Sequence, residues 1–115
     1  MSDLKKMTAA INAFRDKRNW RQFHDPKDLA LSLVLEATEV LEHFQWKSGE
    51  NLKTYLAKNK KEVSYELADT LYWLLTISHD LEIDLMKAFS EKMKLNEKKY
   101  PVKKSKGRSE KYDKL

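Results

Sequence analysis

Residues that break helices are rare in this chain. Its 115 residues include two Gly and two Pro, whereas a protein built of strands needs such residues at its many turns. Leu, Lys, Glu and Ala dominate instead, and all four favour helices. The sequence therefore predicts an all-α protein. Its length allows one small domain, whose thin core would be thickened by association into an oligomer.

Apolar residues recur every three or four positions in five stretches, which is the spacing of one helix face. Residues suited to N-caps stand before three of them, namely Ser2, Asp25 and Asp84. Pro26 fits the first turn of the second helix, and Pro101 ends the last one. The expected helices cover residues 3–17, 26–46, 50–58, 60–81 and 85–100.

Composition excludes several kinds of site. The chain has no Cys, so disulfides and thiolate metal sites are excluded, and a bound metal would have oxygen or imidazole ligands. No apolar run approaches the roughly 18 residues that cross a bilayer, and no secretory leader is visible. We expect a cytoplasmic protein.

Positive charge is concentrated at the C-terminus. Residues 98–115 contain eight Lys or Arg and two acids, a local net charge of +6, while the whole chain carries +5. We therefore expect a helical domain over residues 1–101 and a polar, extended basic tail over residues 102–115. Such a tail binds nucleic acid, an anionic membrane or a polyanionic small ligand, or is simply solvated.

Two pairs of carboxylates interrupt helices that are otherwise apolar. Between residues 29 and 41 the second helix is apolar almost all round, which is typical of a helix buried on most sides. Glu36 and Glu39 stand within it at a spacing of i, i+3, so both point roughly the same way. Glu66 and Asp69 repeat this spacing on the helix at 60–81, and Trp73 shares their face.

Four carboxylates on two facing helices would repel one another, and each is costly to remove from water. A divalent cation resolves both problems, and an all-oxygen ligand set selects a hard ion, Mg²⁺ or else Mn²⁺. The alternative is that the pairs lie on solvated faces. A ferritin-like di-iron site requires Glu-x-x-His pairs, and His43 stands at the wrong spacing.

Trp20 and Trp46 are expected in exposed settings, one in a polar loop and one at a helix end. Tryptophan is usually a core residue, but these two positions suit stacking on a flat base. Trp73 either lines the same pocket as the carboxylates or packs in the core. Structural or solvated roles are expected for five further titratable residues: His24, His43, His79, Asp80 and Glu82.

These motifs together resemble the MazG-like, all-α nucleotide pyrophosphohydrolases. Glu36-x-x-Glu39 followed by Glu66-x-x-Asp69 is similar to the signature E-x-x-E…E-x-x-D of that family. The resemblance extends over about residues 10–115 and is strongest to the dCTP pyrophosphatase branch. The segments that carry it are residues 18–24, 44–47, 66–71, 92–101 and 106–112.

The resemblance implies a four-helix-bundle-type MazG-like fold assembled as an oligomer, a dimer or tetramer, with active sites near subunit contacts. It implies Mg²⁺ held by the four matching carboxylates, and hydrolysis of a (deoxy)nucleoside triphosphate to the monophosphate and pyrophosphate. The residues matching Trp20 and Trp46 would box the base. Glu36 or Glu39 would act as general base, with the choice open. Further expected nucleotide contacts are Trp73, Asn96, Lys99, Tyr100, and the tail cations Lys103, Lys104, Lys106 and Arg108.

Three positions depart from the dCTP pyrophosphatase branch: Ile11, Tyr65 and Trp73. They leave the carboxylates intact, so base selectivity is the property left open. Our prediction is an enzyme that cleaves dCTP or a related deoxynucleotide in nucleotide-pool house-cleaning. The alternatives are a broad-specificity NTP or dUTP hydrolase, and a non-enzymatic helical module that binds through its basic tail. We expect no membrane partner and no nucleic acid polymer.

Overall fold

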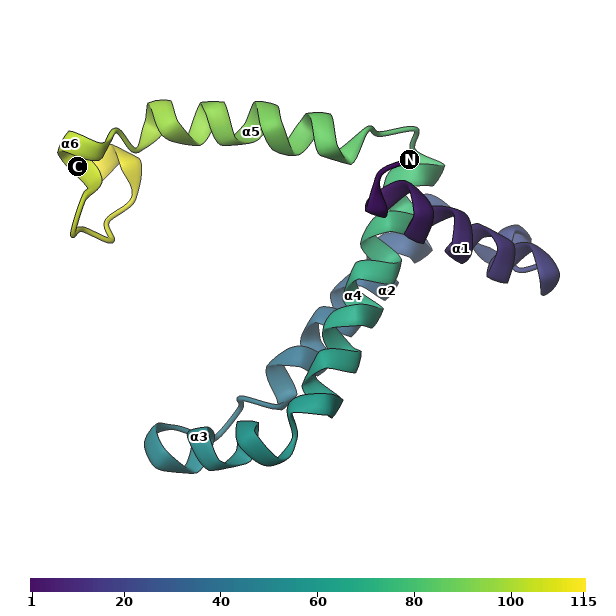
Figure 1. The fold of residues 1–115 in the computed structure, drawn as a ribbon, viewed down its shortest axis with the longest axis horizontal. Helices are drawn as coiled ribbons and strands as arrows, with labels where there is room; N and C mark the ends of the chain where they lie inside the picture. Colours follow the sequence, from purple (N-terminus) through teal and green to yellow (C-terminus); the bar gives the residue numbers. More distant parts are fainter. The chain divides into compact units, whose positions relative to one another are not determined.

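The computed structural model describes all residues, Met1–Leu115, and every regular element is helical (Figure 1). The prediction of an all-α protein is confirmed. The chain forms two compact units, Met1–Glu82 and Ile83–Leu115. The first contains α1 (Asp3–Lys17), η1 (Arg21–Phe23), α2 (Pro26–Glu42), α3 (Gly49–Lys58) and α4 (Lys60–Asp80), and the second contains α5 (Leu85–Lys99), α6 (Val102–Ser105) and η2 (Tyr112–Lys114).

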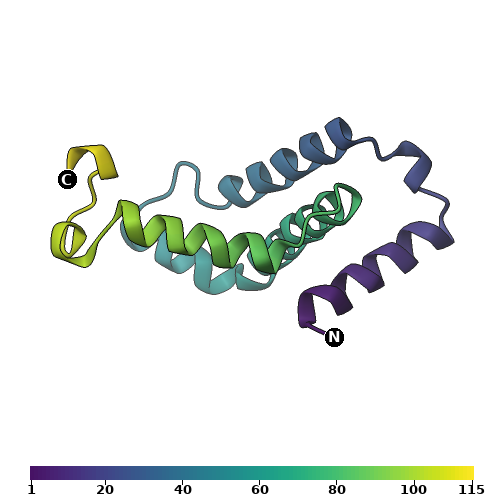
Figure 2. The same ribbon diagram turned by 90° about the horizontal axis from the view of Figure 1, so that it is seen from above.

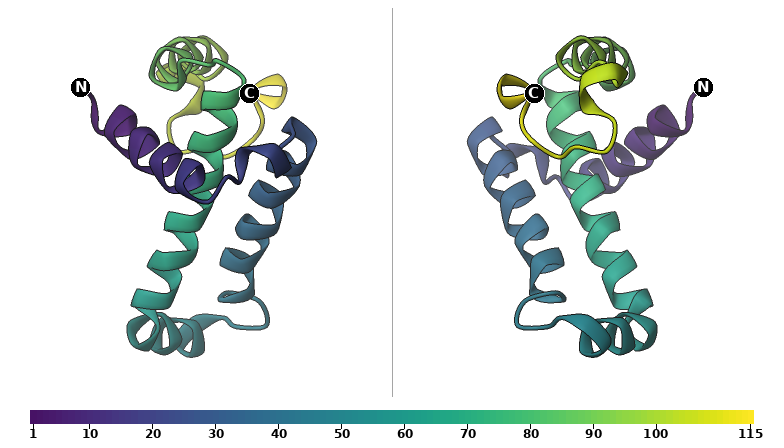
Figure 3. Two further views of the ribbon diagram at one scale, coloured as in Figure 1. Left: turned by 90° about the vertical axis from the view of Figure 1, so that its right-hand side faces the viewer. Right: turned by 90° about the vertical axis from the view of Figure 1, so that its left-hand side faces the viewer.

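The first unit is organised around α4, which packs against α1, α2 and α3. Figure 3 shows α2 and α4 side by side, with the short α3 joining their ends and α1 crossing α4. Leu29 of α2 and Leu75 of α4 are the fully buried apolar residues. This pairing of α2 with α4 brings the two carboxylate motifs to one place.

The expected N-caps are present. The side chain of Ser2 accepts a hydrogen bond from the Lys5 N–H, and Asp25 and Asp84 each accept one from the N–H three residues later. These bonds satisfy backbone donors that the first turn of a helix leaves unpaired. The starts of α1, α2 and α5 are therefore determined locally, as the sequence predicts.

The second helix is shorter than expected, because it ends at Glu42 and not near Trp46. The N–H groups of Phe44 and Gln45 both donate to the Leu41 carbonyl, which turns the chain out of the helix. Trp46 then adopts a left-handed conformation with φ 66°. That conformation is unfavourable for a bulky residue and cannot continue an α-helix.

Burial along α2 also differs from the expectation of a helix buried on most sides. Four apolar side chains on it are more than half exposed in the single chain: Leu31 at 51%, Val34 at 62%, Leu35 at 64% and Leu41 at 57%. Single exposed apolar residues are ordinary, but a contiguous group marks a surface that another molecule covers. The first unit by itself therefore leaves one face of α2 without an apolar partner.

In the second unit, α5 is followed by a folded tail (Figure 2). The Pro101 carbonyl accepts from the N–H groups of Lys104 and Ser105, which forms the single turn of α6. Tyr112 packs edge-to-face on Tyr100 with ring centroids 6.2 Å apart. The expectation of an extended tail is wrong, because these contacts fold residues 102–115 back on themselves. No helix of the chain has both the length and the apolar character that a membrane span requires.

Candidate metal centre and active site

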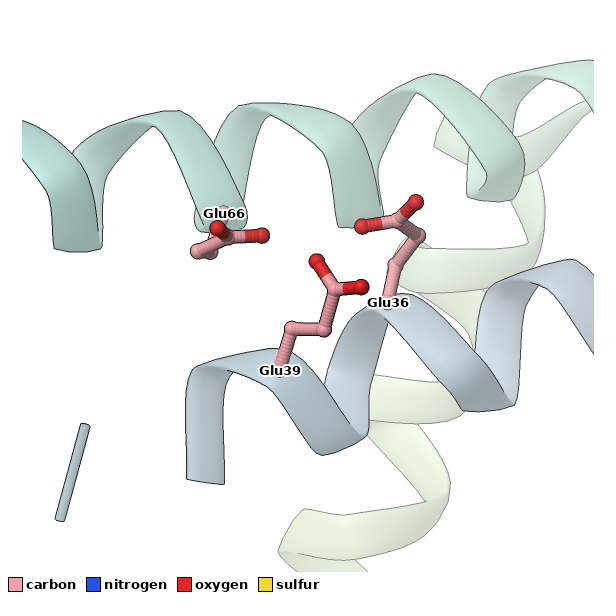
Figure 4. Close-up of side chains that lie close together, drawn as sticks. All are labelled: Glu36, Glu39 and Glu66. Carbon is pink, nitrogen blue, oxygen red and sulfur yellow. The ribbon is translucent and has the colours of Figure 1, made fainter. Parts of the chain in front are cut away.

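Three carboxylates converge between α2 and α4. Glu36, Glu39 and Glu66 each offer one oxygen, and these oxygens all lie within 4.8 Å of one another. Figure 4 shows the Glu36 and Glu39 side chains rising from α2 toward α4, where Glu66 is attached. The i, i+3 spacing on α2 puts two of them on one face, and the packing of α2 on α4 supplies the third.

The crowding makes these groups resist losing their protons. The hydrogen bond with Glu39 raises the pKa of Glu66 to about 7, with burial and the charges of Glu39, Asp69 and Glu36 adding to the effect. Burial also raises the pKa of Glu36, and the charges of Glu39 and Asp69 act in the same direction. Two neighbouring carboxylates therefore hold a proton more tightly than ordinary glutamates do.

Two oxygens of this cluster lack a hydrogen-bond partner. Glu36 Oε2 and Glu66 Oε2 are both buried and unpaired, a costly arrangement for acceptors of this kind. A divalent cation would satisfy both oxygens and replace the shared protons. The ligands are all oxygen, which fits a hard ion such as Mg²⁺ or Mn²⁺. The residues present therefore fit the expected kind of cofactor.

Asp69 lies one turn after Glu66 on α4, and its side chain is exposed. Its negative charge raises the pKa of both Glu66 and Glu36, so it belongs to the same electrostatic environment. It is not one of the three residues whose oxygens converge. Its role as a fourth metal ligand stays a prediction.

Trp73 is the aromatic residue next to the cluster. It is half-buried on α4, and its side chain opposes part of the rise in the pKa of Glu36, whose largest cause is burial. Its ring also meets two others edge-to-face, His24 with centroids 5.6 Å apart and Tyr72 at 5.0 Å. Which of the two roles expected from the sequence Trp73 has, lining the carboxylate site or packing in the core, stays a prediction.

The other two tryptophans are open to solvent. Trp20 is 40% exposed and packs edge-to-face on Phe14, with centroids 5.5 Å apart. Trp46 is 94% exposed and occupies the left-handed turn after α2. A side chain this large, on a strained backbone and almost free of contacts, does not stabilise the fold. Both rings are accessible for stacking, and that role stays a prediction.

The structure also reveals a buried arginine that the sequence interpretation missed. Arg15 of α1 is fully buried, and its guanidinium donates two hydrogen bonds to Asp80 at the end of α4, at 3.0 and 2.7 Å. It donates further bonds to Asn12 Oδ1 at 3.1 Å and to His24 Nδ1 at 3.2 Å. The expectation that Asp80 is solvated is wrong. Its partner lies 65 positions away, and no local pattern identifies such a pair.

Seven of the expected nucleotide contacts belong to the second unit. Asn96 is half-buried on α5, where its amide lies 3.9 Å from the Met93 sulfur. Lys99 lies over the Tyr112 ring at 5.0 Å, and Arg108 forms an exposed ion pair with Glu110. The seven residues are Asn96, Lys99, Tyr100, Lys103, Lys104, Lys106 and Arg108, and their roles stay predictions.

Comparison with protein families identifies the family of the chain, because residues 31–115 match the model of the MazG-like family. The chain belongs to the MazG-like family. It is 36% identical to dCTP pyrophosphatase 1 of Rattus norvegicus over 117 residues, which cover 100% of this chain and 67% of the rat protein. Identity to dCTP pyrophosphatase 1 of Homo sapiens is 34%, again over 100% of this chain and 67% of that protein.

A solved structure supports the same assignment. The crystal structure of a pyrophosphatase from Archaeoglobus fulgidus aligns with a TM-score of 0.82 and 38% identity, over 88% of this chain and 94% of that one. The predictions of a MazG-like fold and of an enzyme of the pyrophosphatase type are thereby confirmed. The carboxylate cluster of this MazG-like chain is the candidate active site.

Proposed function

We propose that this MazG-like chain hydrolyses a deoxynucleoside triphosphate, dCTP or a close relative, to the monophosphate and pyrophosphate. The proposal includes a requirement for Mg²⁺ and a role in cleaning the cytoplasmic nucleotide pool. The observation that carries it is the convergence of Glu36, Glu39 and Glu66 between α2 and α4. The similarity to two mammalian proteins named dCTP pyrophosphatase 1 supports the choice of substrate.

The metal would be held by Glu36, Glu39 and Glu66, with Asp69 as the fourth ligand. When bound, Mg²⁺ neutralises phosphate charge and polarises the bond to be broken. The protein supplies the proton acceptor for the attacking water. Glu36 or Glu39 would take this proton, and the choice between them is open.

The base would stack on Trp20 and Trp46, whose rings are exposed in the first unit. Stacking on an aromatic side chain contributes about 1–3 kcal/mol per base and tolerates different bases. The triphosphate carries several negative charges, and the tail cations Lys103, Lys104, Lys106 and Arg108 would supply complementary charge. Asn96, Lys99 and Tyr100 precede that tail and would contact the nucleotide with it.

A broad-specificity hydrolase is the second candidate, and the exposed rings of Trp20 and Trp46 favour it. Stacking on an aromatic ring is available to every base and therefore discriminates poorly between them. Strong discrimination needs hydrogen-bonding groups that pair with the substrate, since a site built to pair with a substrate amide rejects analogues that lack it.

The exposed face of α2 supports a homo-oligomer, a dimer or tetramer. Leu31, Val34, Leu35 and Leu41 follow helical spacing and form one apolar stripe. A second copy of the chain would bury this stripe and enlarge a core in which only Leu29 and Leu75 are fully buried apolar residues. Light scattering should give a multiple of the 13.6 kDa chain mass, and Leu35→Glu should shift it to one chain.

The decisive experiment measures pyrophosphate release from a panel of canonical and modified dNTPs and NTPs, with Mg²⁺ and with EDTA. The variant is Glu66→Gln, and Glu62→Gln is the matched control, since it removes the same charge from an exposed position one turn earlier on α4. We expect Mg²⁺-dependent release that Glu66→Gln abolishes and Glu62→Gln retains. Absence of release from every nucleotide would overturn the proposal and favour a non-enzymatic binding module.

A further inference from the structure

The segment of residues 18–24, here called the Trp20 loop, joins α1 to α2, and its start is fixed by the end of α1. Asn19 adopts a left-handed conformation with φ 52°, and its N–H donates to the carbonyl three residues earlier. The N–H of Trp20 donates to the Arg15 carbonyl at 3.0 Å. These two bonds form the Schellman arrangement that ends many helices, and the apolar contact that accompanies it is the Trp20 ring on Phe14.

The far end of the Trp20 loop is held by the same arginine, through its side chain. Arg15 Nε–H donates to His24 Nδ1 at 3.2 Å. The arginine is fully buried, and its other nitrogens donate to Asp80 at 3.0 and 2.7 Å and to Asn12 at 3.1 Å. Arg15 therefore holds the loop at both ends, with its carbonyl at the start and its guanidinium at the end.

His24 makes two contacts of different chemistry. Arginine has only donors, so the Nδ1 that accepts from Arg15 carries no proton, and the proton of the neutral ring is on Nε2. Burial and the Arg15 charge both lower the pKa of His24, which agrees with a neutral ring. The ring also meets Trp73 edge-to-face, with centroids 5.6 Å apart. The acceptor and the ring edge can therefore be removed separately by substitution.

Hydrogen bonds inside the loop connect its far end to Trp20. The Phe23 N–H donates to the Trp20 carbonyl at 2.9 Å, and the His24 N–H donates to the Arg21 carbonyl at 3.1 Å. Arg21 also forms an ion pair with Asp16 at 2.6 Å, but both side chains are exposed, and exposed ion pairs contribute little. The bond from Arg15 to His24 is therefore the buried link that holds this part of the loop.

We propose that Arg15 and His24 are positioning residues for Trp20: Arg15 holds the Trp20 loop through its own carbonyl and through the His24 ring, and so keeps the exposed indole where a nucleotide base stacks on it. This inference rests on the proposed function, because it requires that Trp20 contact the base. A loop that is already ordered loses less freedom when a ligand binds. Loosening the loop should therefore weaken nucleotide binding and leave the chemical step unchanged.

Two substitutions separate the contacts of His24. His24→Asn keeps a side-chain acceptor near the Arg15 Nε–H but removes the ring. His24→Phe keeps a ring but removes the acceptor. Trp20→Ala is the reference, because it removes the indole itself. Asp16→Asn is the control, because it weakens only the exposed ion pair to Arg21 in the same loop.

The first measurement is fluorine NMR of the full chain labelled with fluorotryptophan, without metal or nucleotide. The Trp20 signal is identified by its loss in Trp20→Phe. We expect His24→Phe to move this signal toward its position in the urea-unfolded chain, and His24→Asn and Asp16→Asn to leave it close to the wild-type position. A Trp20 signal that His24→Phe leaves unchanged, or that both His24 variants move equally, would overturn the inference.

The second measurement is kcat and KM for dCTP with Mg²⁺, with thermal unfolding followed in parallel. Trp20→Ala should raise KM about tenfold. His24→Phe should raise KM several-fold with kcat unchanged, and His24→Asn should retain the wild-type KM. In the Trp20→Ala background His24→Phe should cause no further rise, since the ring that it positions is absent.

A merely structural role for His24 gives a different result. KM would then follow the melting temperature, and His24→Asn, which loses the contact with Trp73, would be affected as much as His24→Phe. That result would overturn the inference, and a raised KM in Trp20→Ala would leave the stacking role of Trp20 standing. An unchanged KM in Trp20→Ala would overturn that stacking role, and this inference with it. A wild-type chain that hydrolyses no dCTP would overturn the proposed function, and the inference with it.

Discussion

Metal binding at the carboxylate cluster should depend on pH in a way that the Glu66 pKa of about 7 determines. A metal ion competes with the proton that Glu66 holds, so apparent affinity falls as the pH drops below this value. With that pKa, Glu66 is about 90% protonated at pH 6 and about 10% protonated at pH 8. The apparent Mn²⁺ affinity should therefore be about tenfold weaker at pH 6 than at pH 8. The raised pKa of Glu36 makes this dependence steeper.

The assay is titration calorimetry in two buffers of different protonation enthalpy, which counts the protons released. From Glu66 alone, about 0.9 proton per ion should appear at pH 6 and about 0.1 at pH 8. Glu66→Gln should remove this contribution, and Glu62→Gln should retain it. An affinity that is equal at the two pH values, with no proton released at pH 6, would refute the argument that these carboxylates share protons in the metal-free protein.

The same pKa shift determines the sign of a stability effect. Between pH 4.5, the ordinary Glu value, and about pH 7, the metal-free folded chain keeps a Glu66 proton that the unfolded chain releases. The Glu66 proton therefore contributes to the free energy of unfolding at low pH, and this contribution is lost as the pH rises through that window. His24 acts oppositely, because its lowered pKa favours the folded state as the pH rises toward 6.5. The rise in melting temperature caused by metal should accordingly grow from pH 5 to pH 8.

Three further outcomes are expected. Asp80→Ala should lower the free energy of unfolding by about 3–5 kcal/mol in urea titrations, because it leaves the buried charge of Arg15 without its carboxylate partner. The double variant Arg15→Met/Asp80→Leu should have a free energy of unfolding much closer to that of the wild type. A loss below about 1 kcal/mol for Asp80→Ala would contradict this prediction. Trp46→Ala should raise KM about tenfold or more and leave kcat and the melting temperature unchanged, and Trp46→Phe should restore KM. Equal KM values for the wild type and both variants would show that Trp46 does not contact the nucleotide. Truncation after Pro101 should raise KM through loss of the tail cations, and unchanged steady-state kinetics would exclude the tail from substrate binding.

The features predictable from sequence are those with local causes. Caps at Ser2, Asp25 and Asp84 depend on bonds within one turn, so the starts of their helices could be predicted. The carboxylate motifs could be recognised because i, i+3 spacing puts each pair on one helix face. Their convergence between α2 and α4 required only that the two apolar helices pack together.

The features that were missed depend on contacts between distant residues or on unusual backbone. Asp80 resembles a solvated acid near a helix end, and only the fold shows that Arg15 is buried against it. The second helix was expected to reach Trp46 because its residues are compatible with a helix, yet the left-handed backbone at Trp46 accompanies termination at Glu42. Its apolar residues are typical of a buried helix, but the first unit by itself covers only part of them.

Two unfavourable features of the single chain share a physical explanation. The first unit without metal leaves an apolar stripe on α2 uncovered. It also leaves the buried oxygens Glu36 Oε2 and Glu66 Oε2 unpaired where α2 faces α4. Each feature lowers the stability of the folded chain, and a molecule that binds there would offset this loss. We expect a second copy of the chain to cover the stripe and a cation to bind the unpaired oxygens. Because α2 carries both surfaces, we expect a molecule that covers the stripe to restrain the helix that presents Glu36 and Glu39 as well. Oligomer formation and metal affinity should therefore rise together, and Leu35→Glu should weaken Mn²⁺ binding although its side chain touches no metal ligand.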